Sequence, residues 1–229
     1  MQPFVPQSVI GQSLNCPKEI YLRYLILILL LATTAFTAVQ PSVENNFFDA
    51  PVTESDMIVD GLLSEPFWSN ALQISVNYEI TPGDNIPAPV KTTAYLTYNK
   101  DALLIGFDAR DDNPSAIRAN LADRDAPHSD DFCGIIMDTF NDEIRAYEFM
   151  STAAGIQMDT YRNEQLRESE DPTWDAIWQN ASQITENGYQ TEIRIPWRAV
   201  RFPNGQNKKT FGFHLFRSYP RDVRYIIGA

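Results

Sequence analysis

Side chains capable of nucleophilic or metal chemistry are scarce in this sequence. The histidines are His128 and His214, and the cysteines are Cys16 and Cys133. No Gly-x-Ser-x-Gly, His-Glu-x-x-His, phosphate-loop or Gly-x-Gly-x-x-Gly pattern occurs, so the common hydrolase, metalloprotease and nucleotide-binding motifs are absent. Cys133 lies in an apolar pattern typical of a strand, where burial leaves a thiol inert. We predict a buried free thiol there and no zinc site.

Carboxylates are the remaining groups that could catalyse a reaction. Asp111-Asp112 and Asp130-Asp131 are adjacent pairs, and glycoside hydrolysis requires two carboxyl groups at a fixed separation. Most such residues in an acidic chain are solvated turn formers, so we predict no catalytic residue and keep a small glycoside hydrolase as an alternative. Asp111, Asp112 and Asn113 also offer oxygen ligands to calcium, although no EF-hand spacing is present. Calcium is the one cofactor considered, and its ligands stay unassigned.

The aromatic residues are better candidates for a functional site than the carboxylates, since Phe, Trp and Tyr make up 12% of the chain. A flat aromatic ring can pack against the apolar face of a pyranose sugar. Trp68 and Trp197 lie in apolar turns that contain proline, so we predict that both belong to the core. Trp174 follows a polar stretch and is the candidate for exposure and ligand contact. Trp178 has the opposite phase in the same segment and is predicted to be buried.

The charge of the chain limits its partners. The net charge of -12 comes from 30 acidic and 18 basic residues, and no basic run is longer than Lys208-Lys209. Nucleic acids and anionic membrane surfaces require a concentrated basic patch, so neither is expected as a partner. Neutral ligands and cations remain open.

An apolar segment near the N-terminus predicts export. Residues 24–39 are uncharged, follow Lys18 and Arg23, and precede a polar stretch, as in a secretory signal. We therefore divide the chain into a signal segment (1–38), a spacer (39–56) and a folded domain (57–229), and we expect an extracytoplasmic location in the periplasm, the outer membrane or the medium. An uncleaved membrane anchor is the alternative.

The folded domain is predicted to consist of short strands separated by turns. It opens with the Asp60-Gly61 turn and a helical turn at Pro66, preceded by Ser64 as a possible cap, that directs Phe67, Trp68 and Ala71 inward. Apolar and β-branched patterns predict strands near 91–98, 102–109, 130–140, 145–151, 156–161, 181–185, 189–195 and 210–219. The charged segment 162–171 is predicted to be a surface loop, and residues 197–200 one helical turn. This pattern indicates an all-β protein, an antiparallel β-sandwich with a few short helical turns and the 91–109 hairpin near its middle.

Several motifs in a fixed order carry a family resemblance: Ile58-Val59-Asp60-Gly61, Glu65-Pro66-Phe67-Trp68, Ala102-Leu103-Leu104-Ile105-Gly106-Phe107, Ser129-Asp130-Asp131-Phe132, Gly155-Ile156-Gln157-Met158-Asp159, Trp174-Asp175-Ala176-Ile177-Trp178 and Ile195-Pro196-Trp197. Together they resemble the family 9 carbohydrate-binding module-like domain of secreted and outer-membrane bacterial proteins, over about residues 55–221. The resemblance implies a jelly-roll-like β-sandwich that binds sugar chain ends between tryptophans, sometimes with calcium. In related proteins such a domain precedes a large outer-membrane barrel region, so we expect this chain to be a fragment.

The residues and the resemblance together predict a non-catalytic carbohydrate-binding module of a secreted or cell-surface bacterial protein, linked to polysaccharide breakdown or uptake. Its partner would be an oligo- or polysaccharide, held by Trp174 with the polar groups of Arg162 and Asp130. The alternative is a structural domain that docks to a following membrane barrel region of the same parent protein and binds no sugar.

Overall fold

Strands dominate the structure, as the sequence pattern predicts. The computed structural model describes residues 47–229 except 127–128, 167–168, 172 and 206–207. Helical structure within these residues is limited to three short 3-10 turns: η1 (Pro66–Asn70), η2 (Pro114–Ala116) and η3 (Trp197–Ala199). None of the helical elements in this part of the chain is long and apolar enough to cross a membrane. The predicted signal segment, Cys16 and His128 lie outside the described residues.

The five-stranded sheet contains the predicted central hairpin. Its strands lie in the order β1-β4-β5-β11-β10, and neighbouring strands are antiparallel. The bounds are β1 (Leu72–Ser75), β4 (Thr92–Tyr98), β5 (Ala102–Arg110), β10 (Gln179–Thr185) and β11 (Gly188–Pro196). In the turn between β4 and β5, Asn99 Oδ1 accepts hydrogen bonds from the amides of Asp101 and Ala102. The 91–109 hairpin therefore forms as predicted and lies at the centre of this sheet.

The second sheet has eight antiparallel strands in the order β3-β2-β13-β12-β6-β7-β8-β9. The bounds are β2 (Tyr78–Thr81), β3 (Ile86–Pro87), β6 (Phe132–Asp138), β7 (Arg145–Thr152), β8 (Gln157–Asn163), β9 (Glu170–Asp171), β12 (Gly212–Pro220) and β13 (Arg224–Gly228). The predicted loop at 162–171 is thus corrected in part, because Arg162 still belongs to β8 and Glu170–Asp171 forms β9. The residues at this end of the strand pair, Arg162, Asn163, Glu170 and Asp171, are all polar, so no alternation marks them as strand in the sequence.

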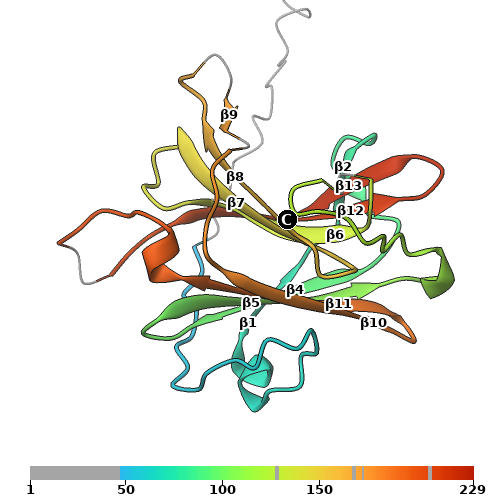
Figure 1. Ribbon diagram of the computed structural model, residues 1–229, viewed down its shortest axis with the longest axis horizontal. Helices are drawn as coiled ribbons and strands as arrows, with labels where there is room; N and C mark the ends of the chain where they lie inside the picture. The colour runs from blue at the N-terminus through green and yellow to red at the C-terminus, as the bar shows by residue number, and fades with distance from the viewer. Residues whose placement is uncertain (1–46, 127–128, 167–168, 172, 206–207) are drawn as a thin grey trace, which may run out of the picture. The chain divides into compact units, whose positions relative to one another are not determined.

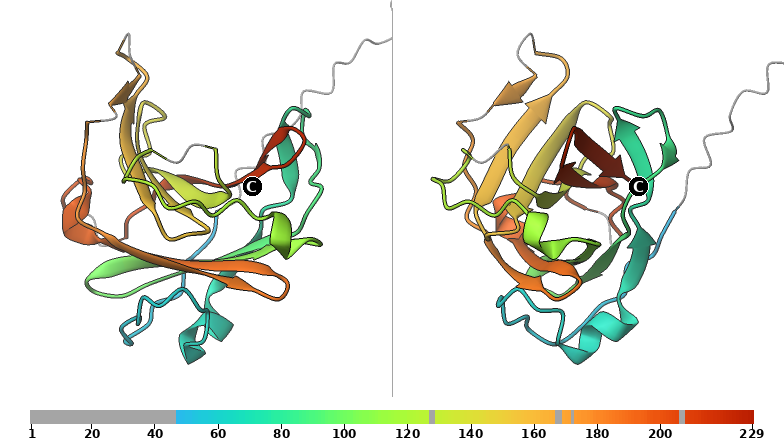
Figure 2. Two further views of the ribbon diagram at one scale, coloured as in Figure 1. Left: turned by 45° about the vertical axis from the view of Figure 1, so that its right-hand side comes forward. Right: turned by 90° about the vertical axis from the view of Figure 1, so that its right-hand side faces the viewer.

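The two sheets stack face to face and enclose the main core, as Figures 1 and 2 show. Alternate residues of each strand point into this core, for example Ile105 and Phe107 from β5 and Ile135 and Met137 from β6. All four side chains are almost completely buried. The predicted all-β antiparallel sandwich is confirmed.

The opening segment forms a further layer on the outer face of the five-stranded sheet. Phe67, Trp68 and Ala71 are buried as predicted, but they belong to a separate apolar cluster that also contains Leu104. Gly106 makes the close approach possible, because a Cβ at that position would lie 2.5 Å from Leu63 Cδ2 and 3.3 Å from the Trp68 ring. Trp68 therefore attaches the N-terminal segment to the sheet and does not fill the space between the sheets.

The predicted capping of η1 by Ser64 is wrong. The residue before the helical turn is Glu65, and no side chain caps the turn. The Glu65 carboxylate instead accepts hydrogen bonds from the Ile58 amide at 3.0 Å and from the Trp68 indole N–H at 3.1 Å. It thereby joins the start of the segment to its tryptophan.

Contacts with the sheet begin within the predicted spacer. The Thr53 amide donates to the Tyr98 carbonyl at 2.8 Å, and the Tyr98 amide donates to the Pro51 carbonyl at 3.3 Å. The compact unit spans Phe47–Ala229.

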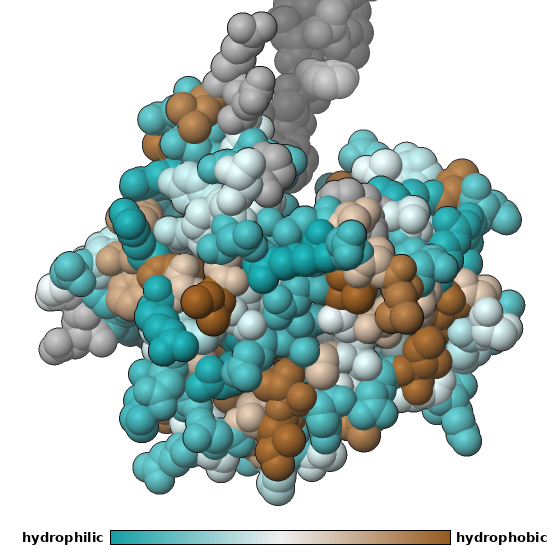
Figure 3. All heavy atoms as spheres, viewed as in Figure 1, coloured by the Kyte–Doolittle hydropathy of each residue, from teal (hydrophilic) through white to brown (hydrophobic). Residues whose placement is uncertain are grey.

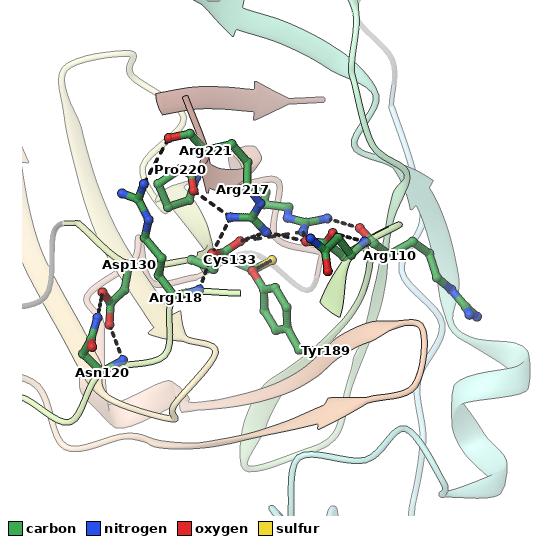
Figure 4. A network of polar contacts seen from close by, with 12 residues as sticks. Arg110, Arg118, Asn120, Asp130, Cys133, Tyr189, Arg217, Pro220 and Arg221 are labelled. Carbon is green, nitrogen blue, oxygen red and sulfur yellow. Dashed lines mark hydrogen bonds and ion pairs between the residues drawn. The ribbon is translucent and has the colours of Figure 1, made fainter. Parts of the chain in front are cut away.

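A buried arginine connects the two sheets, as Figure 4 shows. Arg217 of β12 is fully buried and donates to Thr92 Oγ1 at 3.0 Å and to the Arg110 carbonyl at 2.8 Å, both on the opposite sheet. Its guanidinium also lies over the Tyr189 ring, 5.3 Å from the centroid. Arg217 shares the inward face of β12 with Leu215, so this otherwise apolar position of the core holds a charge.

Two aspartates balance this charge. Arg217 Nη2 lies 3.8 Å from Asp111 Oδ2 and 3.9 Å from Asp131 Oδ1. Arg221 contacts both carboxylates directly and donates to Asp131 Oδ2 at 2.9 Å. Two arginines therefore neutralise two buried carboxylates, which is the condition for keeping charges in a core.

Cys133 lies next to this network as the predicted buried free thiol. Its Sγ is 3.3 Å from the Tyr189 hydroxyl. Burial raises the pKa of the Cys133 thiol to about 11. An inert thiol is therefore expected at neutral pH.

Candidate functional site

Trp174 lies at the margin of the core, between β9 and β10. Its ring centroid is 5.1 Å from that of Tyr147, 5.9 Å from that of Phe149 and 6.5 Å from that of Tyr161. The side chain remains partly exposed. Aromatic packing thus fixes the orientation of the indole while part of it still faces solvent.

A pocket of about 250 Å³ adjoins this tryptophan. Its lining residues are Trp174, Asp175, Ala176, Ile177, Arg198 and Ala199. Ile177 is 79% exposed although it is apolar. The pocket thus combines an aromatic ring and an exposed aliphatic side chain with one acidic and one basic group, as small-molecule sites commonly do.

A second pocket, of about 420 Å³, shares Arg198 with the first. Its lining residues are Lys100, Asp101, Arg194, Pro196, Trp197 and Arg198. The Trp197 indole N–H donates to the Asn99 carbonyl at 3.0 Å, which fixes the ring beside the β4–β5 turn. Trp197 is only partly buried, so the prediction of a core tryptophan holds in part.

The backbone after Trp174 is held by a charged group. Asp159 Oδ2 accepts a hydrogen bond from the Ala176 amide at 2.8 Å. Arg124 contacts Asp159, donates to the Ala176 carbonyl at 3.1 Å and pairs with Asp175 at 3.0 Å. Burial raises the pKa of Asp159, and the hydrogen bonds from Ala176 and Arg124 oppose that rise. These contacts position the floor of the first pocket.

Arginine side chains contact two acidic groups whose oxygens could be ligands for calcium. Carboxylate oxygens of Asp125, Asp159 and Asp175 lie within 4.8 Å of one another, but Arg124 forms ion pairs with all three. Asp111 is buried and contacts Arg221. Because a guanidinium already supplies positive charge in both places, we assign no calcium ligand.

Arg162 and Trp174 belong to different faces of the second sheet. Arg162 follows Tyr161, whose ring contacts Trp174, and successive strand residues point to opposite faces. Arg162 pairs with Glu148 at 2.8 Å and with Glu170 at 2.7 Å. Its guanidinium therefore serves ion pairs on the outer face, away from the pocket.

Asp130 is also remote from the pocket. It is buried and accepts hydrogen bonds from the Asn120 amide and side-chain nitrogen, both at 2.7 Å, which hold the loop before β6 (Figure 4). It precedes Phe132, which pairs with Thr152 at the opposite end of β7 from Arg162. The structure does not bring the three predicted ligand residues together.

Five polar or charged residues line the pockets and were not predicted as ligand residues: Lys100, Asp101, Asp175, Arg194 and Arg198. Arg198 lies within the correctly predicted helical turn after Pro196, so its neighbourhood to Trp197 could have been noticed. The position of Arg198 beside Trp174 could not have been predicted, since β11 and the residues before β10 come together only when the strands of the sheet pair. Trp178 is buried, as predicted.

Comparisons with known proteins agree with this architecture. The sequence profile described as "Carbohydrate family 9 binding domain-like" matches residues 59–218. The structure of a family 9 carbohydrate-binding module from Caldicellulosiruptor kristjanssonii in complex with glucose matches this chain with a TM-score of 0.54 and 14% sequence identity. The match covers 77% of this chain and 83% of that one. A structure of a family 9 module from the same organism in complex with cellotriose matches with a TM-score of 0.55 and 14% identity, and the match covers 78% of this chain and 81% of that one. A comparison with curated proteins finds no match. Because the family profile matches this chain over most of its length, the chain belongs to the carbohydrate family 9 binding domain-like family.

Proposed function

We propose that this domain is a non-catalytic carbohydrate-binding module of a secreted or cell-surface bacterial protein that takes part in polysaccharide breakdown or uptake. The observation that carries the proposal is the partly exposed Trp174 ring in a pocket with Asp175 and Arg198. An oriented indole can pack on a sugar ring, and the two charged groups can exchange hydrogen bonds with sugar hydroxyls. The family 9 structures with glucose and cellotriose support this class of ligand.

The carboxylates around the pockets support a role without catalysis. Each pocket is lined by a single carboxylate, Asp175 in the first and Asp101 in the second. Asp175 pairs with Arg124, and Asp101 pairs with Lys100 at 2.8 Å. Glycoside hydrolysis requires an acid and a second carboxylate acting as base or nucleophile, so neither lining favours the hydrolase alternative.

Binding of cello-oligosaccharides to the protein, measured by titration calorimetry, tests the proposal. We expect Trp174→Ala to weaken binding by roughly tenfold or more, since it removes the stacking surface. Trp174→Phe, which retains a flat ring, should retain most of the affinity. Ile184→Ala is the matched control, because Ile184 is exposed and lines neither pocket.

The structural alternative has its own supporting observation, because Trp174 contacts three other aromatic rings and contributes to packing. If no neutral or acidic saccharide binds the unmodified protein, the carbohydrate-binding proposal is abandoned in favour of a domain that docks to the rest of its parent protein. Thermal unfolding of each variant separates loss of binding from loss of fold.

A further inference from the structure

We propose that the two pockets accept a saccharide bearing an anionic group, a carboxylate or a sulfate, which Arg198 and Arg194 bind. This inference rests on the proposed function and specifies its ligand. It starts from a contrast of charge, because the chain carries a net charge of -12 whereas three cations, Lys100, Arg194 and Arg198, line the two pockets.

The two carboxylates of the lining do not neutralise the arginines. Asp101 pairs with Lys100 at 2.8 Å, and Asp175 pairs with Arg124 at 3.0 Å. Arg194 donates to the neutral side chain of Gln179 at 3.4 Å. Arg198 forms no hydrogen bond or ion pair with any residue in the described part of the chain. Two guanidinium groups are therefore available to an anion.

Both arginines project from well-anchored backbone. Arg194 belongs to β11, where it is paired with Leu104 on one side and with Gln179 on the other. Arg198 follows Trp197, whose amide donates to the Asp101 carbonyl at 3.0 Å. A fixed backbone reduces the entropy lost when the side chains order around a ligand.

The chemistry of the guanidinium group selects the ligand. Its planar set of N–H donors matches a carboxylate or sulfate with two parallel hydrogen bonds, and such charge-assisted bonds are stronger than those to a neutral hydroxyl. Trp174 in the first pocket and Trp197 in the second provide aromatic surface for the sugar rings themselves. A short oligomer of uronic acid sugars carries both features in one molecule.

The surface of the molecule is mixed in character. From the viewpoint of Figure 1, Figure 3 shows hydrophobic residues in separate patches among hydrophilic ones. Lys209, which lies 5.7 Å from the ring centroid of Phe202, adds a further cation near Trp197, because Phe202 packs against that tryptophan. A charged, hydrated chain suits such a surface better than a continuous apolar partner does.

Titration calorimetry of the protein with oligogalacturonate and with its methyl ester of equal length tests the inference. The two ligands differ only in charge, so we expect the acid to bind about tenfold more tightly than the ester at low salt. Raising the salt from about 20 to about 200 mM should reduce this preference, because exposed charges are screened. A sulfated oligosaccharide in a third titration distinguishes a carboxylate-specific site from a general anion site, and both results support the inference.

Arg198→Gln should remove most of the preference for the acid and leave binding of the ester within twofold. Arg201→Gln is the matched control, since Arg201 is exposed nearby but lines neither pocket. Equal affinity for acid and ester, or a preference that survives Arg198→Gln, overturns this inference and leaves the proposed function intact. Absence of binding by acid, ester and cello-oligosaccharide alike overturns the proposed function itself.

Discussion

Glu192 provides the sharpest test of how the opening segment is held to the sheet. This residue of β11 is completely buried beneath that segment. Its Oε2 accepts hydrogen bonds from the amides of Asp60 at 3.0 Å and Gly61 at 2.9 Å, and its Oε1 accepts one from the Trp68 indole at 3.3 Å. Glu65 accepts from the same indole N–H, so two carboxylates share one donor in a dry environment.

The contribution of Glu192 to the free energy of unfolding follows from the proton that this residue retains in the folded protein. Burial, with the negative charge of Glu65 close by, raises the pKa of Glu192 from 4.5 to about 7, although the amides of Gly61 and Asp60 oppose the rise. The folded protein therefore holds this proton more tightly than the unfolded chain does. The resulting stabilisation is complete below pH 4.5 and is lost as the pH rises through about 7. It amounts to roughly 3 kcal/mol at most, at 1.36 kcal/mol per pH unit.

Urea unfolding of the wild type and of Glu192→Gln between pH 5 and 8.5 measures this contribution. We expect the free energy of unfolding of the wild type to fall by about 2 to 3 kcal/mol over this range on account of Glu192. Glu192→Gln should lack this fall and be destabilised by about 1 to 3 kcal/mol at pH 5, because its amide group places a donor against the Trp68 N–H. Burial also raises the pKa of Asp131, Glu148 and Asp159, but these residues act equally in both proteins and cancel in the difference.

Glu186→Gln is the matched control, because Glu186 is exposed in the turn between β10 and β11. Its pH profile should follow that of the wild type. Parallel profiles for the wild type and Glu192→Gln would refute the reasoning, since they would mean that Glu192 does not carry the retained proton.

Three further predictions concern the core and its turns. Arg217→Met should lower the free energy of unfolding in urea by roughly 3 kcal/mol or more, because it leaves two buried carboxylates with one guanidinium. An effect below about 1 kcal/mol would contradict the conclusion that Arg217 neutralises these carboxylates. Gly61→Ala should cost about 1 to 3 kcal/mol, since φ is +88° and a Cβ would lie 2.7 Å from the Ser182 carbonyl carbon, and an unchanged Tm would contradict this. In a Cys16→Ser variant, whose one remaining thiol is Cys133, an aromatic disulfide reagent at pH 8 should react only after unfolding, because burial raises the pKa of Cys133 to about 11, and rapid reaction of the native variant would show that this thiol is accessible.

The alternation of apolar and polar residues predicted the strands, because successive side chains of a half-buried strand point in turn to the core and to solvent. The strands of the β4–β5 hairpin and of the β10–β11 hairpin were located correctly from their apolar and β-branched residues. The pattern failed at β9, where exposed polar residues give no contrast between faces. It also did not reveal that Trp68 faces the outer side of a sheet, because burial alone leaves open which neighbour covers a side chain.

The candidate site was predicted less well than the fold. Trp174 was identified from its place after a polar segment, and it does line a pocket. Arg162 and Asp130 were chosen for their charge, yet ion pairs and hydrogen bonds occupy both elsewhere. Arg198 was passed over because an isolated exposed arginine has no distinguishing pattern in sequence.

The sequence by itself determined the class of fold, the turns and the residues that must be buried, because these depend on local periodicity and on the intrinsic preferences of glycine, proline and asparagine. Only the tertiary structure decided which charges meet. Through antiparallel pairing of strands distant in sequence, Arg217 comes to lie beside its aspartates, and Arg198 comes to line a pocket with Trp174. Electrostatic contacts act over a few ångströms in space, so their partners cannot be assigned until the chain is folded.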